Sequence, residues 1–323
     1  MDFLDSIHLF RHLTKSEKRI IEDFNRQSLN VHGHTTLFNW WRSGSYLWFT
    51  QRYEEKLAAA GKQMNLCSLF GDRRVLEHVS GIKVFYSGEN VHNSPYDEYS
   101  DYLLRDKSTS LGIGFEYFEN KRYLRFPLWI LYMFKPTSTR QDIIDRCREL
   151  RYPEVSGKTR FCSMVASHDW NGLRRIMVDQ LKSIDTVDCP GKYLHNDNRL
   201  KSAYNDDKIA YLRQYYFNIC PENSNCAGYV TEKAFEAISA GCIPIYWGDY
   251  NTPEPSVLNE EAILFWNKDQ DNKDLIQKIS HLFSSPEEMD RFLRLPRLKD
   301  GAEDVIWGMI ESLDSAMDSI LKA

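Results

Sequence analysis

A glutamate and a lysine at the start of a predicted helix are the residues best suited to chemistry in this sequence. Thr231 is a favourable N-cap and Gly241 a favourable helix end, so the sequence predicts a short helix over residues 232–240. Glu232 and Lys233 then lie in its first turn. A cation and backbone N–H groups there favour a phosphate, and a carboxylate can bind sugar hydroxyls. The pair predicts a nucleotide site, although Glu232 alone would be interpreted as offsetting the helix dipole.

Arg174 is predicted to lie at a second helix start of the same kind. It follows a strand predicted over 160–166 and lies near the start of a helix predicted over 171–184. Open α/β sheets bind ligands where a strand ends and a helix begins. A solvent-exposed arginine is an equally good interpretation of Arg174 alone. Lys233 favours the functional one, because two cations at neighbouring helix N-termini suit a diphosphate.

Glu89 is the candidate for proton transfer in the first half of the chain. It follows the apolar run VFYSG, so it lies at the exit of a predicted strand, where a carboxylate can act as a general base. Considered alone, this segment is better interpreted as a carboxylate held by turn N–H groups. In the loop before the helix at 232–240, Glu222 and Asn223 add groups able to hold ribose or sugar hydroxyls.

Other common chemistries have no matching pattern in the sequence. The histidines do not group with acids at metal-ligand spacing, and no serine stands in a G-x-S-x-G turn. GxGxxG and GxxxxGK[ST] loops are also absent. We therefore expect no metal site and neither a classical dinucleotide site nor a P-loop.

Composition and charge describe a globular chain of 323 residues with 42% hydrophobic content and a formal net charge of −5. The charge makes nucleic acid a poor partner. The first thirty residues lack a signal-peptide core, and no window approaches the ~18 apolar residues of a membrane span. The seven cysteines form no C-x-x-C pair, which favours reduced thiols. We expect a cytoplasmic protein without a transmembrane segment, with a position at the inner membrane face as a variant.

Strands alternate with helices along the whole chain, which predicts an α/β fold with parallel sheets covered on both faces. A short helix predicted within 135–158 and flanked by Pro136, Pro153 and Gly157 marks a junction between two domains. We expect a first domain over 1–156, a second over 157–300, and a C-terminal helix over 301–323 that packs back on the first domain. A cleft between two such domains is the expected place for a site.

Residues 217–248, FNICPENSNCAGYVTEKAFEAISAGCIPIYWG, resemble the signature of the α1,3-fucosyltransferases of glycosyltransferase family 10. VFYSGEN at 84–90, RYLRFPLW at 122–129 and SMVASHDWNGLRR at 163–175 agree with bacterial members in the same order. NWW at 39–41 extends the resemblance over most of the chain.

This resemblance implies the GT-B architecture, in which two Rossmann-like domains face each other across a cleft. The first domain would bind the acceptor and the second GDP-fucose. The implied reaction is inverting transfer of L-fucose from GDP-β-L-fucose to the 3-hydroxyl of GlcNAc or Glc in lactosamine- or lactose-type glycans, the units of Lewis antigens. The expected partners are therefore GDP-fucose and an oligosaccharide acceptor. No cofactor is expected to be required, and a divalent metal at most stimulates.

Carried over by position, the general base of the family falls on Glu89. The donor-binding places fall on Arg174, Asn223, Tyr229, Glu232 and Lys233. Pro221 replaces the usual residue before EN, and SHDW replaces an Asn-containing turn, so contacts from Pro221 and His168 are not carried over.

Two other functions remain open on the sequence. A GT-B transferase could use another nucleotide sugar, because contacts to phosphate and ribose do not identify the sugar. A catalytically silent glycan- or nucleotide-binding relative could keep the fold. The sequence does not determine whether the acceptor is a type 1 chain, a type 2 chain or lactose. It also leaves open the balance of α1,3 and α1,4 linkage and the oligomeric state. Acceptor specificity is expected in loops such as 42–48 and 90–106.

Overall fold

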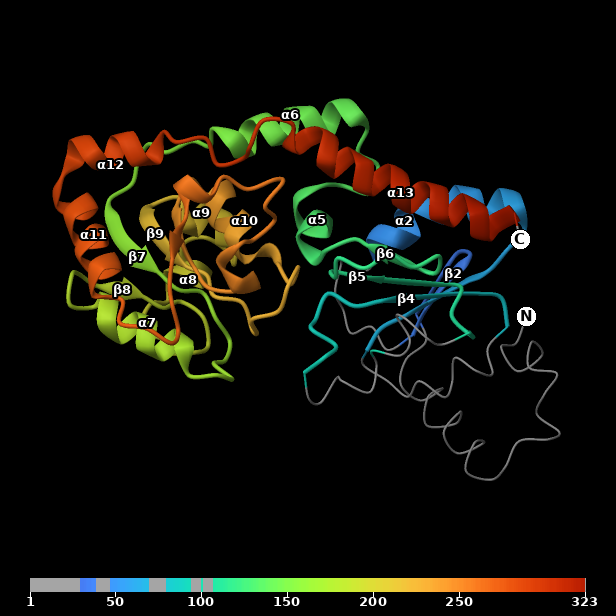
Figure 1. The fold of residues 1–323 in the computed structure, drawn as a ribbon, viewed down its shortest axis with the longest axis horizontal. Coiled ribbons are helices and arrows are strands. Elements are labelled where there is room, and N and C mark those ends of the chain that lie inside the picture. The colour runs from blue at the N-terminus through green and yellow to red at the C-terminus, as the bar shows by residue number, and fades with distance from the viewer. Residues whose placement is uncertain (1–29, 39–46, 70–79, 94–99, 101–106, 323) are drawn as a thin grey trace, which may run out of the picture. The chain divides into compact units, whose positions relative to one another are not determined.

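The computed structural model describes residues 30–38, 47–69, 80–93, 100 and 107–322, and it divides into two compact units (Figure 1). Unit 1 comprises Met1–Ser138 and Gly308–Ala323, and unit 2 comprises Thr139–Trp307. The NWW segment at 39–41 and much of the loops 42–48 and 90–106 lie outside the described residues. Each unit is built on a mostly or wholly parallel sheet with helices, so the predicted α/β class is confirmed.

Unit 1 contains a six-stranded sheet in the order β1-β2-β3-β4-β5-β6. The first two strands pair antiparallel and the rest parallel. The strands are β1 (Asn30–His32), β2 (Thr35–Phe38), β3 (Met64–Cys67), β4 (Ile82–Tyr86), β5 (Leu111–Gly114) and β6 (Tyr123–Arg125). The central strands are buried along almost their whole length, as parallel strands covered on both faces must be.

The helices in the described part of unit 1 are α2 (Leu47–Ala60), α5 (Leu128–Met133) and the C-terminal part of α13 (Ala302–Lys322). The side chains of α2 at helical spacing, Phe49, Tyr53 and Leu57, are buried and form its apolar face. Phe49 packs on Tyr86 of β4 with ring centroids 5.0 Å apart. The aromatic residues of α2 therefore fix this helix against the strand that leads to Glu89.

Unit 2 contains a five-stranded, wholly parallel sheet in the order β11-β10-β9-β7-β8. Its strands are β7 (Arg160–Ser163), β8 (Val187–Asp188), β9 (Tyr215–Ile219), β10 (Ile243–Tyr246) and β11 (Leu264–Phe265). Its helices are α6 (Arg140–Arg151), α7 (Leu173–Leu181), α8 (Arg199–Ser202), α9 (Lys208–Leu212), α10 (Glu232–Ser239), α11 (Lys273–Ser284), α12 (Pro286–Leu293) and the start of α13. The predicted helix at 232–240 is thus present almost to the residue, whereas the helix predicted over 171–184 is shorter at both ends.

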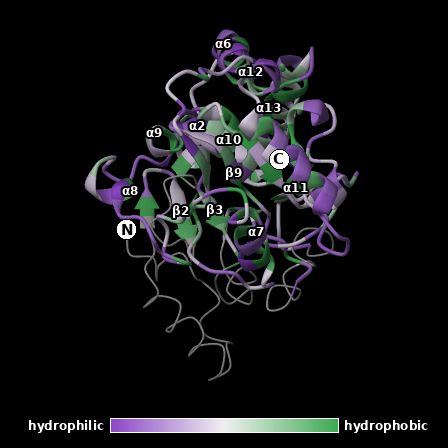
Figure 2. Ribbon diagram, turned by 90° about the vertical axis from the view of Figure 1, so that its left-hand side faces the viewer, coloured by the Kyte–Doolittle hydropathy of each residue, from purple (hydrophilic) through white to green (hydrophobic). Residues whose placement is uncertain are grey.

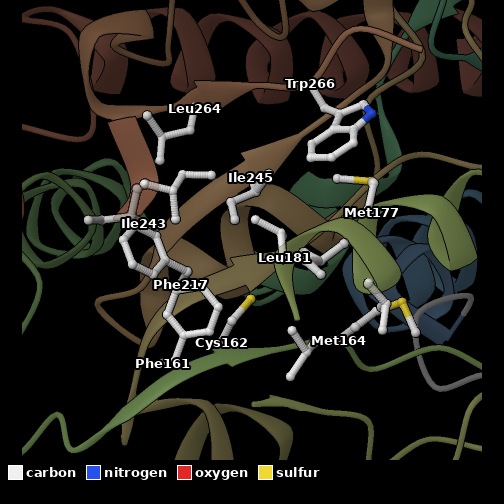
Figure 3. Close-up of a cluster of buried hydrophobic side chains, with 14 of the residues drawn as sticks. Phe161, Cys162, Met164, Met177, Leu181, Phe217, Ile243, Ile245, Leu264 and Trp266 are labelled. Carbon is white, nitrogen blue, oxygen red and sulfur yellow. The ribbon is translucent and has the colours of Figure 1, made fainter. Parts of the chain in front are cut away.

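The core of unit 2 forms between this sheet and the helices beside it. In Figure 3, Phe217, Ile243 and Ile245 of the central strands lie beside Met177 and Leu181 of α7. Figure 2 shows hydrophobic residues gathered in the strands and hydrophilic residues along the connecting loops. Burial of these side chains anchors the strand ends from which the loops of the candidate site emerge.

The compact units divide between Ser138 and Thr139, upstream of the junction expected at 156/157. Helix α6 therefore belongs to unit 2, where Arg146 donates a hydrogen bond of 2.7 Å to Ser239 Oγ at the end of α10. In addition, Arg151 forms an ion pair of 2.7 Å with Glu303. These polar contacts are made over long sequence separations, so the pattern of Pro and Gly residues could not reveal them.

Two further predictions concern the whole chain. No helix in the described part of the chain combines the length and the hydrophobicity that crossing a bilayer requires. All seven cysteines are free of disulfides; six are buried and Cys226 is partly buried.

The contact of α13 with α2 predicts a stability effect within unit 1. Arg52 holds Asp314 through two hydrogen bonds, of 2.8 and 2.6 Å, and the Tyr53 hydroxyl donates a third, of 2.9 Å. We expect Asp314→Ala to lower the free energy of unfolding by about 1–2 kcal/mol, because it leaves the largely buried Arg52 without its carboxylate. Urea denaturation followed by fluorescence measures the change.

The exposed ion pair Lys56–Asp318, one turn further along α13, provides the matched control. Asp318→Ala should cost no more than about 0.5 kcal/mol. Burial acts to raise the pKa of Asp314. The hydrogen bonds and the charge of Arg52 outweigh this effect, so the pKa of Asp314 is lower than that of an ordinary carboxyl group. The stabilisation is therefore fully present above the ordinary carboxyl pKa and is lost progressively as the pH falls from that value through the lowered pKa of Asp314 in the folded protein. Equal losses in the two variants at neutral pH would contradict this account.

Candidate functional site

The predicted donor-binding residues all emerge at one edge of the sheet of unit 2. Strands β7, β9 and β10 are parallel neighbours, so their carboxyl ends meet at this edge. Ligands bind to open α/β sheets at such an edge. Arg174 follows β7, the loop after β9 supplies Asn223 and Tyr229, and the first turn of α10 supplies Glu232 and Lys233.

Arg174 lies in the first turn of α7, after Gly172 with φ of 74°. Only 7% of the residue is exposed. Its guanidinium donates hydrogen bonds of 2.5 Å to the His168 carbonyl oxygen and 2.9 Å to Asn223 Oδ1. Two residues predicted separately from the sequence, Arg174 and Asn223, therefore contact each other directly.

The charge of Arg174 is compensated mainly by neutral oxygens. Among the residues that the structure describes, no carboxylate lies within ion-pair distance of its guanidinium. Burial lowers its pKa, and the more distant charges of Asp169, Glu222, Tyr229 and Glu232 act in the opposite direction. A buried cation without a directly bound carboxylate is an environment that favours an anionic ligand.

Side chains of the protein already accept hydrogen bonds from the backbone N–H groups at the start of α7. The Asp169 carboxylate accepts hydrogen bonds from the N–H groups of Arg174 and Arg175, at 3.2 and 3.0 Å. Asn171 Oδ1 accepts from the Leu173 N–H group at 3.0 Å. At this helix an anion is therefore offered the arginine side chain rather than free N–H groups. The sequence analysis did not predict that Asp169 caps this helix, although an Asp shortly before a helix is a recognised capping signal.

Lys233 is held by a buried carboxylate that the sequence did not identify as its partner. The Glu222 side chain accepts hydrogen bonds from the Thr231 N–H group at 2.8 Å, the Thr231 hydroxyl at 2.6 Å and Lys233 Nζ at 3.1 Å. Lys233 Nζ also donates to the Thr231 hydroxyl at 2.7 Å. Glu222 is 1% exposed, so the expectation that it holds sugar hydroxyls was wrong. It positions Lys233 instead.

Burial raises the pKa of Glu222, and the Lys233 ammonium acts against this rise. Glu232 lies 3.8 Å from Lys233 Nζ and is partly exposed. Burial acts to raise its pKa as well, but Lys233 and Lys208 together lower it. Glu232 is thus an ionised acceptor at the helix start, suited to hydroxyl groups. Tyr229 is fully buried near Arg174, and it forms part of the wall of the site.

The loop after β10 supports this arrangement through Gly248. This glycine has φ of 147°, and a Cβ atom there would lie 2.6 Å from Glu222 Cγ and 2.9 Å from the Tyr246 hydroxyl. The next three residues, Asp249, Tyr250 and Asn251, have positive φ values of 46°, 48° and 59°. Asp249 Oδ1 accepts a hydrogen bond of 2.6 Å from the Gly228 N–H group. A strained turn thus packs against the loop that precedes α10 and carries Asn223 and Tyr229, two of the predicted donor-binding residues.

Glu89 lies in unit 1, directly after β4. The Ser87 hydroxyl donates to the Glu89 carbonyl oxygen at 2.8 Å and accepts from the Glu89 N–H group at 3.1 Å. Ser87 therefore fixes the backbone of the predicted base on both sides of its Cα atom.

Within the described ranges, no group of three or more His, Cys, Asp or Glu residues is arranged to hold a metal ion.

Two family models match the chain. Residues 155–298 match the model described as glycosyltransferase family 10 (fucosyltransferase) C-term, and residues 42–132 match the alpha-(1,3)-fucosyltransferase FucT N-terminal domain. The chain is 30% identical over 263 residues to alpha-(1,3)-fucosyltransferase FucT of Helicobacter pylori, covering 69% of this chain and 50% of that protein. It is 32% identical over 210 residues to alpha-(1,3)-fucosyltransferase B of Drosophila melanogaster, covering 60% and 44%. The chain thus spans about half the length of these relatives, or less.

Solved structures show the same fold. A crystal structure of an alpha1,3-fucosyltransferase matches with a TM-score of 0.58 at 23% identity, over 90% of this chain and 89% of that one. An alpha1,3-fucosyltransferase crystallised with GDP-fucose matches with a TM-score of 0.52 at 22% identity, over 80% and 78%. These likenesses confirm the predicted GT-B fold class.

The packing at Gly248 predicts the effect of a single methyl group. We expect Gly248→Ala to destabilise unit 2 by about 2–4 kcal/mol, because its Cβ atom meets Glu222 and Tyr246 and an L residue is strained at this φ. Thermal unfolding measures the effect. Gly157→Ala is the matched control, because that glycine also has positive φ but nothing lies within 4 Å of its Cβ position. It should cost only about 1–2 kcal/mol. Equal costs would show that crowding against Glu222 contributes nothing.

Proposed function

We propose, from the premise that this chain belongs to the fucosyltransferases of glycosyltransferase family 10, that it transfers L-fucose from GDP-fucose to an oligosaccharide acceptor. The proposed linkage is α1,3, to the 3-hydroxyl of GlcNAc or Glc in lactosamine- or lactose-type glycans. The products then belong to the Lewis-antigen type, made in the cytoplasm.

The observation that carries the proposal is the buried charge of Arg174. It is compensated in direct contact by carbonyl and amide oxygens, whereas buried cations in proteins are normally paired with an anion. A diphosphate provides that anion. The guanidinium is already oriented by Asn223 and His168, so little side-chain entropy is lost when the phosphate binds.

Lys233 and Glu232 supply the second half of the donor site in this proposal. The Lys233 ammonium is fixed by Glu222 and Thr231, and it adds a positive charge where the β-phosphate develops negative charge as the sugar departs. The ionised Glu232 accepts hydrogen bonds from hydroxyl groups of the donor. The solved relative that contains GDP-fucose supports the assignment of this nucleotide sugar.

The proposed chemical step is a single displacement with inversion. Glu89 takes the proton from the acceptor 3-hydroxyl, whose oxygen forms a bond to C1 of fucose. The bond between C1 and the β-phosphate oxygen breaks, and GDP leaves from the opposite face. A β-linked donor therefore gives an α-linked product. Arg174 and Lys233 carry the stabilisation of the leaving group, so we propose that no cofactor is required and that a divalent metal is at most stimulatory.

Two alternatives are separated from this proposal by experiment. A transferase specific for another nucleotide sugar would show turnover with GDP-mannose or UDP-galactose and none with GDP-fucose. A catalytically silent binding relative would bind GDP-fucose or a glycan without releasing GDP. The presence of a candidate base, Glu89, in addition to a set of candidate donor-binding residues favours an enzyme over a binder.

Removing the charge of Lys233 should reduce kcat/KM for GDP-fucose by roughly 10²–10³-fold, the usual cost of losing one transition-state donor. The measurement is GDP release with Lys233→Ala, under conditions that saturate the acceptor. Lys182→Ala is the matched control, because this lysine lies in the same unit, is half exposed and makes only a 3.8 Å contact to Asp179. If Lys233→Ala were as active as Lys182→Ala, the proposal that Lys233 stabilises the leaving group would be wrong.

Glu89→Gln should reduce kcat by roughly 10²–10⁴-fold, because the amide cannot accept the proton. Affinity for GDP-fucose, measured by calorimetry, should stay within twofold of the wild type. The assay uses lactose and type 1 and type 2 N-acetyllactosamine as acceptors, with and without EDTA, and the linkage is read by NMR. Loss of GDP-fucose affinity together with kcat would assign Glu89 to donor binding. Complete loss of activity in EDTA would contradict the proposal that no metal is required.

A further inference from the structure

A second pair of titratable side chains lies at the same sheet edge of unit 1 as Glu89. Strands β4 and β5 are adjacent and parallel, so their carboxyl ends meet at one edge. Glu89 and His92 follow β4, and Glu116 follows β5. His92 Nε2 is hydrogen-bonded to Glu116 Oε1. This contact joins the two loops across the edge from which the proposed base emerges.

The pair is built into the sheet on one side and open on the other. The Glu116 N–H group donates a hydrogen bond of 2.8 Å to the Tyr123 hydroxyl, which fixes the backbone of Glu116 to β6. Side-chain exposure is 38% for His92 and 18% for Glu116. Glu116 Oε2 is buried and has no hydrogen-bond partner among the residues that the structure describes. A ligand hydroxyl can satisfy a carboxylate oxygen of this kind, whose isolation otherwise costs free energy.

Two exposed aromatic residues follow the pair in the sequence. Tyr117 is 60% exposed and Phe118 is 44% exposed. The Arg125 guanidinium lies 4.2 Å from the centre of the Tyr117 ring, so it covers one face of the ring and holds its orientation. Phe118 and Arg125 also line an open depression of about 510 Å³. Adjacent exposed aromatic rings beside a depression are typical of a binding surface.

We propose that His92, Glu116 and Tyr117 form the surface that binds the acceptor oligosaccharide. The exposed Tyr117 ring stacks on the C–H face of a sugar ring, while His92 and Glu116 hydrogen-bond the hydroxyls at its edge. This inference rests on the proposed function and assigns the residues that hold the acceptor. His92, Glu116 and Tyr117 contact substrate by binding, and proton transfer stays with Glu89.

The charge of the pair favours a neutral sugar over an anion. The hydrogen bond with Glu116 raises the pKa of His92, which favours an imidazolium beside the carboxylate. An imidazolium and the carboxylate beside it offset each other's charge, so the pair itself attracts neither anions nor cations strongly over distance. It still offers strong charge-assisted hydrogen bonds to hydroxyl groups at close range. A neutral glycan with apolar and hydroxylated faces matches both properties.

The test measures acceptor and donor constants for His92→Ala, Glu116→Gln and Tyr117→Ala in the full chain. We expect KM for N-acetyllactosamine or lactose to rise roughly tenfold in each variant. KM for GDP-fucose and the slow hydrolysis of GDP-fucose without acceptor should stay within twofold. His281→Ala and Tyr132→Ala are matched controls. His281 forms an exposed pair of 2.9 Å with Glu288 on unit 2, and Tyr132 is 49% exposed on α5.

Glycan binding without turnover separates failure of this inference from failure of the proposed function. Saturation-transfer NMR with N-acetyllactosamine and lactose detects binding in the absence of GDP-fucose. If the wild type transfers fucose and the three variants keep its acceptor KM, the inference is wrong and the function stands. If the wild type binds the glycan but transfers nothing, loss of binding in the variants supports the surface and removes the proposed activity. If the wild type neither transfers fucose nor binds these glycans, both are wrong.

Discussion

The buried carboxylate of Glu222 is the constraint on which the candidate donor site depends. A carboxylate that is 1% exposed is costly unless it is fully hydrogen-bonded. Here the Thr231 N–H group, the Thr231 hydroxyl and Lys233 Nζ meet that requirement. The start of α10, the direction of Lys233 and the shape of the loop after β9 are therefore fixed together. Gly248 completes the arrangement, because any larger residue would occupy the space of the Glu222 side chain.

The two cations of the site differ in how the protein compensates them. Lys233 has a carboxylate partner at 3.1 Å, so its net charge is largely offset inside the protein. Arg174 contacts carbonyl and amide oxygens and keeps its charge. Arg174 is therefore the stronger attractor for an anion, and Lys233 a preorganised donor whose position matters more than its field. The Asp169 carboxylate at the start of α7 adds selectivity, because it repels any anion that approaches the helix backbone instead of the guanidinium.

Local signals in the sequence were enough to locate α10 and the helix start that carries Arg174. Capping residues and strand ends are encoded within a few neighbouring residues, so these predictions succeeded. The direction of the Glu222 side chain was not predictable, because it depends on Gly248 in a different loop. The pairing of His92 with Glu116 joins residues 24 apart in the sequence through the order of two strands, which no local pattern contains. The division of the chain at Ser138 likewise depends on contacts of α6 with distant helices.

The left-handed turn at Asp249–Asn251 has a consequence for how the site assembles. Three successive residues other than glycine with positive φ are unfavourable in an isolated peptide, by about 1–2 kcal/mol each. The turn is closed by its own backbone hydrogen bonds from Asn251 to Gly248 and from Thr252 to Asp249. It is also held from outside, since the Gly228 N–H group donates to Asp249 and the Tyr250 N–H group donates to Asn225. Part of the stabilisation of the turn therefore depends on the pairing of β9 with β10, which brings the two loops together. An isolated peptide with the sequence of this turn lacks those outside contacts, which help to hold its backbone at positive φ in the folded protein.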